Sequence, residues 1–480
     1  MNPIPGLRGF ALLVMVFAAV ALPARTGAQG AAKDWPQWRG PLGTGAAPAA
    51  DPPTTWSETQ NVRWKVKLPG AGRSTPVVWD KYVFVQTAVP VARNAQADTP
   101  GADGDAPVVL VQQQQPQPGG GRRGGPGGPV GRGGGARGGF GGGAPPTEAY
   151  RFVLLCLDRA TGNTLWEKVA RQEVPHEGHH RDGSFSSYSP VTDGKNIWAY
   201  FGSRGLHCYD LQGNLKWSKD LGRMQTKNSF GEGSSPALHG DTLVINWDHE
   251  GDDFIVALDK NTGKELWRQP RDEDTTWATP LIVEHEGRAQ VVTCATSKVR
   301  SYDLKTGKPI WEVGPLTANV IPSPVAGDGM VFATSGFRGA ALYAIRLGST
   351  GDLKGTDAIA WSHDKGTPYV PSPLLHDGKL YFFSGNNNVL TCFDARTGKQ
   401  LIDSQRVDDL EGGVYASPVG AGGRVYLVGR GGATVVIKNS GSFEPLATNQ
   451  LDEKFDASPA LAGKEMFLRG QQFLYCLAEK

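Results

Sequence analysis

The chain has 480 residues, of which 39% are hydrophobic and 20% are charged, so it can bury a large core. Its 49 Lys and Arg residues nearly balance its 47 Asp and Glu residues, and the net charge of +2 argues against a general binder of polyanions such as nucleic acid. Five Cys residues are too few for a disulfide scaffold, and 65 Gly residues indicate many turns, a low-complexity segment, or both.

The first 28 residues have the pattern of a secretory signal peptide. Arg8 supplies the positive charge, an unbroken apolar run extends from Phe10 to Leu22, and small residues precede a cleavage site after Ala28. A membrane-anchoring helix is the alternative, but the run is shorter than the roughly 20 residues that a span needs. No later stretch is long and apolar enough to cross a bilayer, and no Cys near the cleavage site offers a lipid attachment point. We therefore expect a periplasmic or secreted protein.

A small residue followed by Pro recurs eight times along the rest of the chain. The dipeptides end at Pro76, Pro190, Pro236, Pro280, Pro324, Pro373, Pro418 and Pro459. After a long first interval the spacing stays near 45 residues, and each unit contains short apolar segments separated by turn signals. A period of this length with four strands per unit is typical of propeller blades. The sequence therefore predicts an all-β fold, an eight-bladed β-propeller of four-stranded blades.

The last repeat unit is incomplete, and the N-terminal part of the chain can complete it. Residues 458–480 supply only three strands, whereas residues 61–66 match the Trp-bearing fourth strand of the other units. We expect residues 61–89 to close the last blade and begin blade one, after an N-terminal extension over 29–60. Residues 149–480 then form the remainder of the ring, whose closure removes the open sheet edges that invite aggregation.

An insertion at residues 90–148 separates the second and third strands of blade one. Of its 25 residues from Gly119 to Gly143, 16 are Gly, and a Gln/Pro run precedes them. Such a segment cannot bury enough surface to offset its ordering entropy, so we expect disorder. Arg122, Arg123, Arg132 and Arg137 among the glycines resemble a nucleic-acid-binding tail, but a surface loop suits an exported protein better.

A turn followed by Trp is the most specific repeated motif. It extends from Asp158 to Trp166, from Asp259 to Trp267 and from Asp303 to Trp311, each time with Thr-Gly at the same offset. Asp would cap backbone N–H groups, Gly would take a left-handed conformation, and Trp would fill the gap between blades. The Trp residues interpreted as structural in this way are Trp64, Trp166, Trp217, Trp267, Trp311 and Trp361.

This spacing resembles the tryptophan-docking repeats of the pyrroloquinoline-quinone (PQQ) family of propellers, over roughly residues 60–89 and 149–480. The segment from Asp34 to Pro41 is similar to the start of exported PQQ-like repeat proteins. By architecture the chain also resembles the propeller subunit of the outer-membrane β-barrel assembly machinery, which carries such repeats without using PQQ. The resemblance therefore implies a quinoprotein-like propeller but leaves its activity open.

The cysteines bear on the cofactor that this resemblance suggests. Quinoprotein dehydrogenases of this kind typically hold PQQ under a bridge between two adjacent cysteines, with acidic and amide calcium ligands around an Asp base. This sequence has no Cys-Cys pair. Cys156, Cys208, Cys392 and Cys476 share one small packing slot in different units, and Cys294 stands alone. The sequence therefore argues against PQQ as a cofactor and identifies no catalytic residue.

Two classes of loop should emerge on one face of the ring: those after the fourth strands and those between the second and third strands. Loop-rich faces on rigid scaffolds are where ligands usually bind. The candidate ligand or partner residues on these loops are His176, Glu177, His179, His180, Arg181, Asp182, Asn228, Glu232, Asp248, His249, Glu250, Trp277, Asn319, Arg338, Tyr369 and Tyr415.

A His-rich segment on this face is a candidate metal site. Residues 176–180 match the zinc-peptidase pattern H-E-x-x-H, but Pro175 and Gly178 make the helix that this chemistry needs improbable. The candidate ligands for a transition metal are His176, His179, His180 and His249, near several carboxylates. A solvated, partly salt-bridged rim is the alternative.

These observations favour an exported, monomeric, non-catalytic binding or scaffold module. It would bind a protein partner or a small molecule on the loop-rich face, with no nucleic acid and no transmembrane segment. The alternatives are a quinoprotein-type oxidoreductase and, third, a metal-dependent enzyme that uses the His-rich loops.

Overall fold

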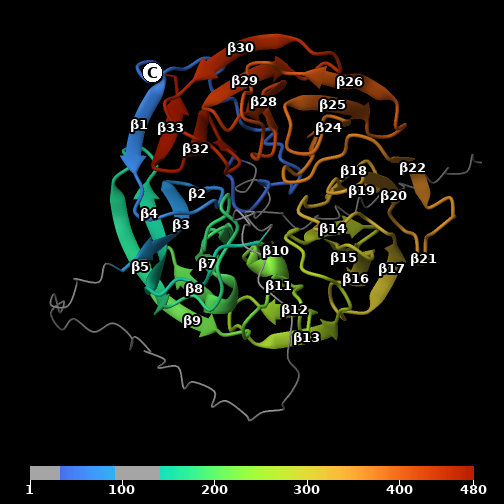
Figure 1. The fold of residues 1–480 in the computed structure, drawn as a ribbon, viewed down its shortest axis with the longest axis horizontal. Coiled ribbons are helices and arrows are strands. Elements are labelled where there is room, and N and C mark those ends of the chain that lie inside the picture. Colours follow the sequence, from blue (N-terminus) through green and yellow to red (C-terminus); the bar gives the residue numbers. More distant parts are fainter. Residues whose placement is uncertain (1–32, 92–140, 480) are drawn as a thin grey trace, which may run out of the picture.

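The structure, a computed structural model, describes residues 33–91 and 141–479. The predicted signal peptide and most of the predicted insertion lie outside these residues. The described residues form eight sheets, each built on four antiparallel strands, arranged as a ring around a central axis (Figure 1). This architecture confirms the predicted eight-bladed propeller.

Blades one to four follow one another along the first half of the ring. Blade one contains β2 (Val77–Trp79), β3 (Tyr82–Pro90), β4 (Tyr150–Asp158) and β5 (Thr164–Glu173). Blade two contains β6 (Val191–Thr192), β7 (Asn196–Tyr200), β8 (Leu206–Asp210) and β9 (Leu215–Lys219). Blade three contains β10 (Ala237–His239), β11 (Thr242–Trp247), β12 (Phe254–Asp259) and β13 (Glu265–Pro270). Blade four contains β14 (Leu281–His285), β15 (Arg288–Cys294), β16 (Val299–Asp303) and β17 (Pro309–Val313).

Blades five to eight complete the circle. Blade five contains β18 (Val325–Gly327), β19 (Met330–Ser335), β20 (Ala341–Arg346) and β22 (Ile359–His363), and β21 (Gly351–Asp352) joins the edge of blade four. Blade six contains β23 (Leu374–His376), β24 (Lys379–Phe383), β25 (Val389–Asp394) and β26 (Gln400–Arg406). Blade seven contains β27 (Val419–Ala421), β28 (Arg424–Val428), β29 (Ala433–Lys438) and β30 (Pro445–Gln450). Blade eight contains β31 (Ala460–Ala462), β32 (Glu465–Arg469), β33 (Phe473–Ala478) and β1 (Val62–Lys67).

The ring closes as predicted, because the N-terminal strand supplies the outer strand of the last blade. β1 pairs antiparallel with β33, with Lys65 opposite Tyr475. In Figure 1 the blue strand β1 therefore lies beside the red strand β33. Two short 3-10 turns, η1 (Gly202–Arg204) and η2 (Lys227–Ser229), are the helical elements of the described residues. No helix in these residues has the length and apolar character needed to cross a membrane.

The Trp-bearing turns join neighbouring blades at the outside of the ring. The indole N–H of Trp166 donates to Leu211 O at 3.0 Å, and that of Trp267 donates to Leu304 O at 2.8 Å, in each case in the next blade. Each ring also packs on the turn glycine of that next blade: a Cβ at Gly307, where φ is +72°, would lie 2.6 Å from the indole of Trp267. Only Gly fits both the space and the left-handed backbone.

Trp311 is the exception among these residues. Its indole N–H donates to Gln290 Oε1 within its own blade at 3.0 Å. Beside it, β17 pairs in parallel with β21, which belongs to the connection between the third and fourth strands of blade five. Blade five lacks the Asp-x-x-Thr-Gly turn of its neighbours, so this longer connection replaces the usual contact.

The repeated dipeptides form a circle of hydrogen bonds near the axis. In seven successive links the backbone N–H of one Ser or Thr donates to the hydroxyl of the next, at 2.9–3.0 Å, beginning with Thr75 to Ser189 and ending with Ser417 to Ser458. The eighth junction differs, because Thr75 Oγ1 donates to Ser458 O at 3.1 Å. A hydroxyl at this position explains why the small residue before Pro is always Ser or Thr.

The segment before β1 crosses the axis rather than hanging from the ring. Trp35 exchanges backbone hydrogen bonds with Val78 in blade one, whereas Ala47 N donates to Gly420 O in blade seven. Between these points the indole N–H of Trp38 donates to Ser323 Oγ at 3.0 Å. Residues 35–47 therefore plug the channel that the innermost strands surround.

Candidate functional site

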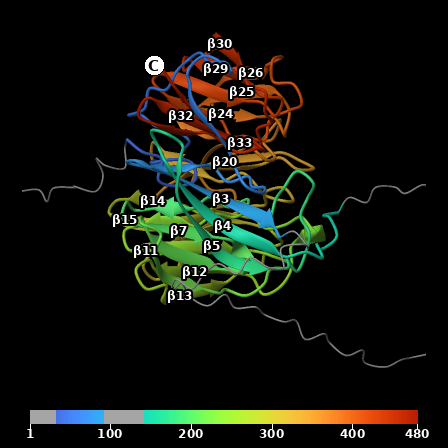
Figure 2. The ribbon, with the colours of Figure 1, turned by 90° about the vertical axis from the view of Figure 1, so that its left-hand side faces the viewer.

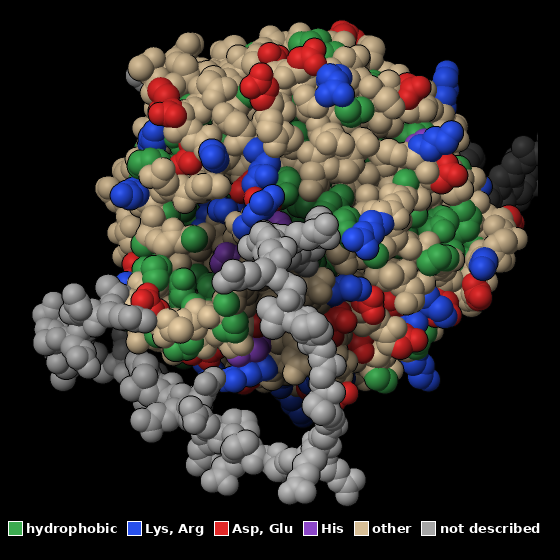
Figure 3. All heavy atoms as spheres, in the orientation of Figure 1, with side chains coloured by type: hydrophobic (Ala, Val, Ile, Leu, Met, Phe, Trp, Pro, Cys, Tyr) green, Lys and Arg blue, Asp and Glu red, His purple; other side chains and the backbone are tan. Residues whose placement is uncertain are grey.

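The loops after the fourth strands and between the second and third strands meet on one face, toward which the arrow of β3 points in the edge-on view of Figure 2. They surround a cavity of about 470 Å³ on the axis. Figure 3 shows this face, with Lys, Arg and His side chains near its middle. The residues that line the cavity define a hollow. We call this hollow the central cavity. Its floor is made by the Ser/Thr circle and by Trp38, which plugs the channel from the opposite side.

Half of the residues predicted for this face line the central cavity. They are His180, Arg181, Asp182, Glu232, Trp277, Asn319, Tyr369 and Tyr415. Phe230 and Phe337 line it from the same loops. Trp38 and Arg73 also line it and were not predicted. Trp38 lies in the N-terminal motif from Asp34 to Pro41, and Arg73 stands two residues before Thr75, the first residue of the Ser/Thr circle. Both features predicted the fold, and neither was used to predict residues of the site.

One wall of the cavity is charged. Arg430 holds Asp182 at 2.9 Å and Asp456 at 2.7 Å, and Arg73 reaches Asp456 at 3.2 Å. Burial alone would raise the pKa of Asp182, but the hydrogen bond and charge of Arg430 bring it below its ordinary value. The Arg430 guanidinium also stacks on Tyr415, 3.9 Å from the ring centroid, and the Tyr415 hydroxyl donates to Asp182 at 3.2 Å. The wall is thus a preformed ionic network that bridges several blades.

The facing wall is aromatic. Phe337 and Tyr369 stack with ring centroids 4.7 Å apart, and Phe230 lies 6.4 Å from Trp277. The indole N–H of Trp277 donates to Gly231 O at 2.6 Å, which fixes the ring against the cavity. Asn319 is buried in this wall, and its side-chain oxygen has no hydrogen-bond partner among the described residues. Flat apolar faces opposite a polar wall suit a ligand that carries both characters.

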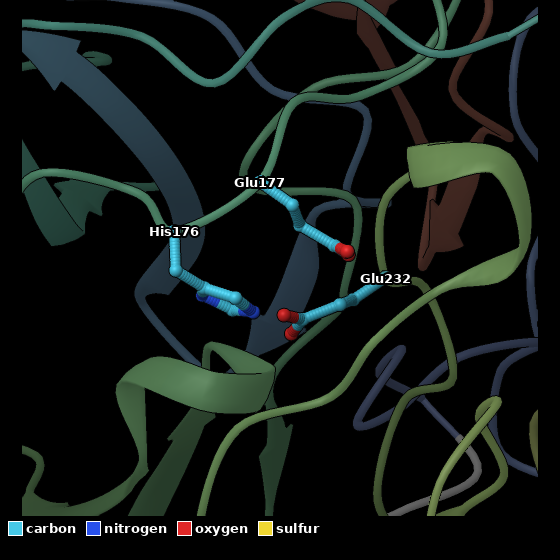
Figure 4. A group of neighbouring side chains, drawn as sticks. All are labelled: His176, Glu177 and Glu232. Atoms are coloured by element: carbon cyan, nitrogen blue, oxygen red, sulfur yellow. The ribbon is translucent and has the colours of Figure 1, made fainter. Parts of the chain in front are cut away.

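The His-rich segment is organised differently from the expectation. His176, Glu177 and Glu232 point toward one another (Figure 4), with one candidate ligand atom from each within 4.8 Å of the others. The other three histidines proposed as ligands do not belong to this group. His249 Nδ1 instead accepts backbone N–H bonds from Gln225 and Gly251. The four candidate histidines therefore do not come together as one group among the described residues.

The three grouped side chains are already hydrogen-bonded by their neighbours. Glu232 accepts from Tyr188, from Ser203 and from Arg204, whose Nη1 lies 2.9 Å from Oε1. His176 and Glu177 form hydrogen bonds with the loop before η2. The Thr226 hydroxyl donates to Glu177 at 2.6 Å, and the His176 ring lies 2.6 Å from Met224 O. Burial raises the pKa of Glu177, although Thr226 opposes the shift. His176 Nδ1 is buried and has no hydrogen-bond partner among the described residues. The hydrogen bonds that both carboxylates already accept favour a structural clamp over a metal centre.

The other predicted face residues lie outside the central cavity. Asp248 is fully buried in an ion pair with Arg271 at 2.6 Å, and Glu250 accepts from Thr275 at 2.8 Å. Arg338 is exposed on the loop between β19 and β20, and its guanidinium carbon lies 5.3 Å from the centroid of the Phe337 ring. These contacts hold or flank the loops without reaching the hollow.

The end of the predicted insertion is ordered where it approaches this face. Gly142 N donates to Asn228 O at 2.7 Å, and Gly143 N donates to His179 O at 2.9 Å. Residues 141–148 therefore depart from the disorder expected for 90–148, because their backbone pairs with the rim. A side cavity of about 730 Å³ lies between this segment and residues 178–181. It shares His180, Arg181 and Phe230 with the central cavity.

The cysteines lie away from the site. All five are free and buried, four of them in the third strands of their blades, and none lines the central cavity. Burial raises the pKa of the Cys208, Cys392 and Cys476 thiols to about 12, which leaves them unreactive at neutral pH. The cavity therefore does not contain the adjacent cysteine pair with which quinoprotein dehydrogenases typically hold PQQ.

Comparison with known proteins places the fold among PQQ-like propellers. The quinohemoprotein alcohol dehydrogenase of Comamonas testosteroni has a TM-score of 0.55 and 11% identity, covering 95% of this chain and 84% of that chain. A europium-containing methanol dehydrogenase has a TM-score of 0.53 and 9% identity, covering 91% and 89%. BamB from Moraxella catarrhalis has a TM-score of 0.46 and 13% identity, covering 70% and 95%. At these identities the likeness concerns the fold alone.

Sequence comparison gives the family. Curated protein sequences provide no match to this chain. A family model described as outer membrane protein assembly factor BamB matches residues 151–402, which is more than half of the chain and spans blades one to six. The protein therefore belongs to the family of PQQ-like repeat propellers described as outer membrane protein assembly factor BamB.

Proposed function

We propose that this protein is an exported, non-catalytic binding propeller whose central cavity receives a small-molecule ligand or a segment of a partner protein. The observation that carries the proposal is the central cavity itself, about 470 Å³ in volume, with one aromatic and one ionic wall. It lies on the axis of a rigid ring, and loops from most blades reach it. Such a preformed hollow, mostly apolar with a few placed polar groups, is the usual form of a binding site.

Family membership supports a protein partner and an extracytoplasmic location. The family description concerns assembly of outer membrane proteins, which takes place outside the cytoplasm. The signal-peptide pattern of residues 1–28 agrees with that location. The location, the monomeric state and the identity of the partner belong to the proposal.

The proposal is tested by photo-crosslinking at two matched positions. A photoreactive residue in place of Phe337 lies on the aromatic wall, whereas one in place of Leu266, 51% exposed on the outer strand β13, faces away from the cavity. In the exported protein we expect a defined adduct from position 337 and none from position 266. Native mass spectrometry tests for a small-molecule ligand. We expect the added mass of a bound ligand in the wild type and its loss in Trp277→Ala. Absence of both signals, or equal adducts at both positions, contradicts the proposal.

A quinoprotein-type oxidoreductase is the alternative, and the same protein tests it. PQQ and calcium are added to the purified chain, and dye-linked oxidation of primary alcohols is measured. We expect no PQQ-dependent turnover, because the cavity lacks the cysteine pair. Turnover that disappears in Trp277→Ala would replace the binding proposal with catalysis.

A metal-dependent activity is the third hypothesis, and it rests on the group of His176, Glu177 and Glu232. Because Glu177 and Glu232 already accept hydrogen bonds from their neighbours, we expect zinc titration at pH 7.5 to give the same heats for the wild type and for His176→Ala. A metal held by His176 would instead produce heat only in the wild type.

A further inference from the structure

The plug of the axial channel contains a buried positive charge without a counter-ion. Arg39 is 1% exposed, and no carboxylate of the described residues forms an ion pair with it. Its Nη2 donates to three carbonyl oxygens, at 2.7 Å to Pro373, 3.0 Å to Pro418 and 3.4 Å to Thr44. Its Nε and Nη1 are buried and have no partner among the described residues. Two of the three guanidinium nitrogens are therefore unsatisfied.

An unpaired guanidinium in this position is costly. Burial lowers the pKa of Arg39 to about 9, so the group still carries its charge at neutral pH. Buried charges in proteins are almost always paired or solvated, because removing a charge from water without compensation is strongly unfavourable. Carbonyl oxygens satisfy part of the hydrogen-bonding capacity of the guanidinium but supply no negative charge.

A cavity lies beside this charge on the side of the plug opposite the central cavity. It has a volume of about 210 Å³ and is lined by Trp38, Arg39 and Gly43 from the plug, and by His239 and Ile282 from the innermost strands of blades three and four. No acidic side chain is among its lining residues. The volume exceeds that of a single water, so the cavity can hold an ion with part of its hydration shell.

We propose that this lower axial cavity binds a small inorganic anion, a halide or an oxyanion of phosphate size, as the counter-ion of Arg39. The anion supplies the negative charge that the carbonyl oxygens cannot provide. Because Arg39 belongs to residues 35–47, the bound anion fastens this segment in the channel. It thereby stabilises the floor on which the central cavity rests.

The direct test is a bromide soak of crystals of the wild-type protein, followed by measurement of anomalous scattering. The expected result is a bromide peak in the lower axial cavity beside Arg39. Bromide peaks elsewhere on the protein with only water beside Arg39 would overturn the proposal. This arm does not depend on any variant being able to fold.

A solution experiment uses a second buried arginine as the matched control. Arg469 is 2% exposed, burial also lowers its pKa to about 9, and its Nη1 donates to Gln86 O at 2.6 Å. Thermal unfolding is followed while sodium bromide replaces sodium gluconate at constant ionic strength. We expect the midpoint to rise by about 2 °C in the wild type and in Arg469→Met, but not in Arg39→Met. An equal rise in all three proteins would be a general salt effect and would contradict the anion site.

Discussion

The tryptophan contacts at the outside of the ring and the rim of the central cavity follow opposite rules. Outside, the same contact recurs in five blades: an indole N–H donates to a carbonyl of the next blade while the ring covers a glycine. At the rim, each loop has its own length, its own side chains and its own hydrogen bonds. The contacts that hold neighbouring blades together therefore repeat from blade to blade. The residues on the surface available for binding do not repeat. Changes outside should alter stability, and changes at the rim should alter binding.

We expect the largest effect on stability when the outer edge of the ring loses a whole strand. Deletion of residues 33–67 removes β1, Trp64 and the axial plug, and it exposes the edge of β33. We expect the cooperative unfolding transition to be lost, as followed by circular dichroism. Lys67→Ala, an exposed change in the same strand, should leave the transition within about 0.5 kcal/mol of the wild type. A truncated protein that unfolds like the wild type would mean that β1 does not close the ring.

A single tryptophan should have the next largest effect. Trp267→Ala removes a large ring and the hydrogen bond to Leu304 O, and we expect it to lower the free energy of unfolding by about 3–5 kcal/mol. Leu266→Ala at the preceding, exposed position should cost less than about 0.5 kcal/mol. Both are measured by urea denaturation. Similar costs for the two variants would show that the docking contact adds little.

The glycine beneath the indole separates steric clash from backbone strain. Gly307→Ala places a Cβ 2.6 Å from Trp267 at a φ of +72°, and we expect a loss of about 1–3 kcal/mol. Gly329→Ala is the matched control, because its φ is +75° but nothing lies within 4 Å of the new Cβ. The difference between the two variants measures the clash alone. Equal losses would assign the whole effect to the backbone.

The smallest expected effect concerns the loss of folding stability at acidic pH. The hydroxyl and backbone N–H of Thr397 bond to Asp394 in a docking turn and lower the pKa of that carboxyl. A carboxyl whose pKa is lower in the folded state contributes stability that is present above its ordinary pKa of about 3.8 and is lost as the pH falls below it. Unfolding measured between pH 6 and pH 3 should therefore show a shallower decline in Asp394→Asn. At the rim of the central cavity, we expect Asp182→Asn to weaken ligand binding and to leave the pH dependence of unfolding almost unchanged. If Asp182→Asn instead altered the pH dependence of unfolding and left ligand binding unchanged, the contrast between the outside of the ring and the rim would be wrong.

The fold could be predicted because its signals repeat. The Ser-Pro and Thr-Pro dipeptides occupy equivalent places in all eight blades, and the Trp-bearing segment at residues 61–66 could be matched to the incomplete last unit. Even the exception at Trp311 coincides with a unit that lacks the usual turn. Repeated packing solutions leave repeated residues, and these are visible without a structure.

The site could be predicted only as a face. Knowing that His176, His180 and His249 belong to loops on one side says nothing about which side chains turn inward. The structure turns His180 into the central cavity, ties His176 to Met224 O and uses His249 to cap its own loop. Trp38 escaped prediction because a side chain from before the first blade has no repeat equivalent. Contacts between segments far apart in sequence decide these positions. Arg73 could have been predicted, because it stands two residues before Thr75. Trp277 and Tyr415, which were predicted, occupy the same place in their own units.

The circle of Ser and Thr hydroxyls has a direction, and this direction ends at one junction. Seven links run the same way around the axis, whereas between blades eight and one the Thr75 hydroxyl donates to a backbone carbonyl. The same junction is where the two ends of the propeller meet through β1 and β33. The ring therefore has one junction that differs from the other seven, between blades eight and one. We expect the blades to separate first at this junction when the protein is unfolded by force or by heat.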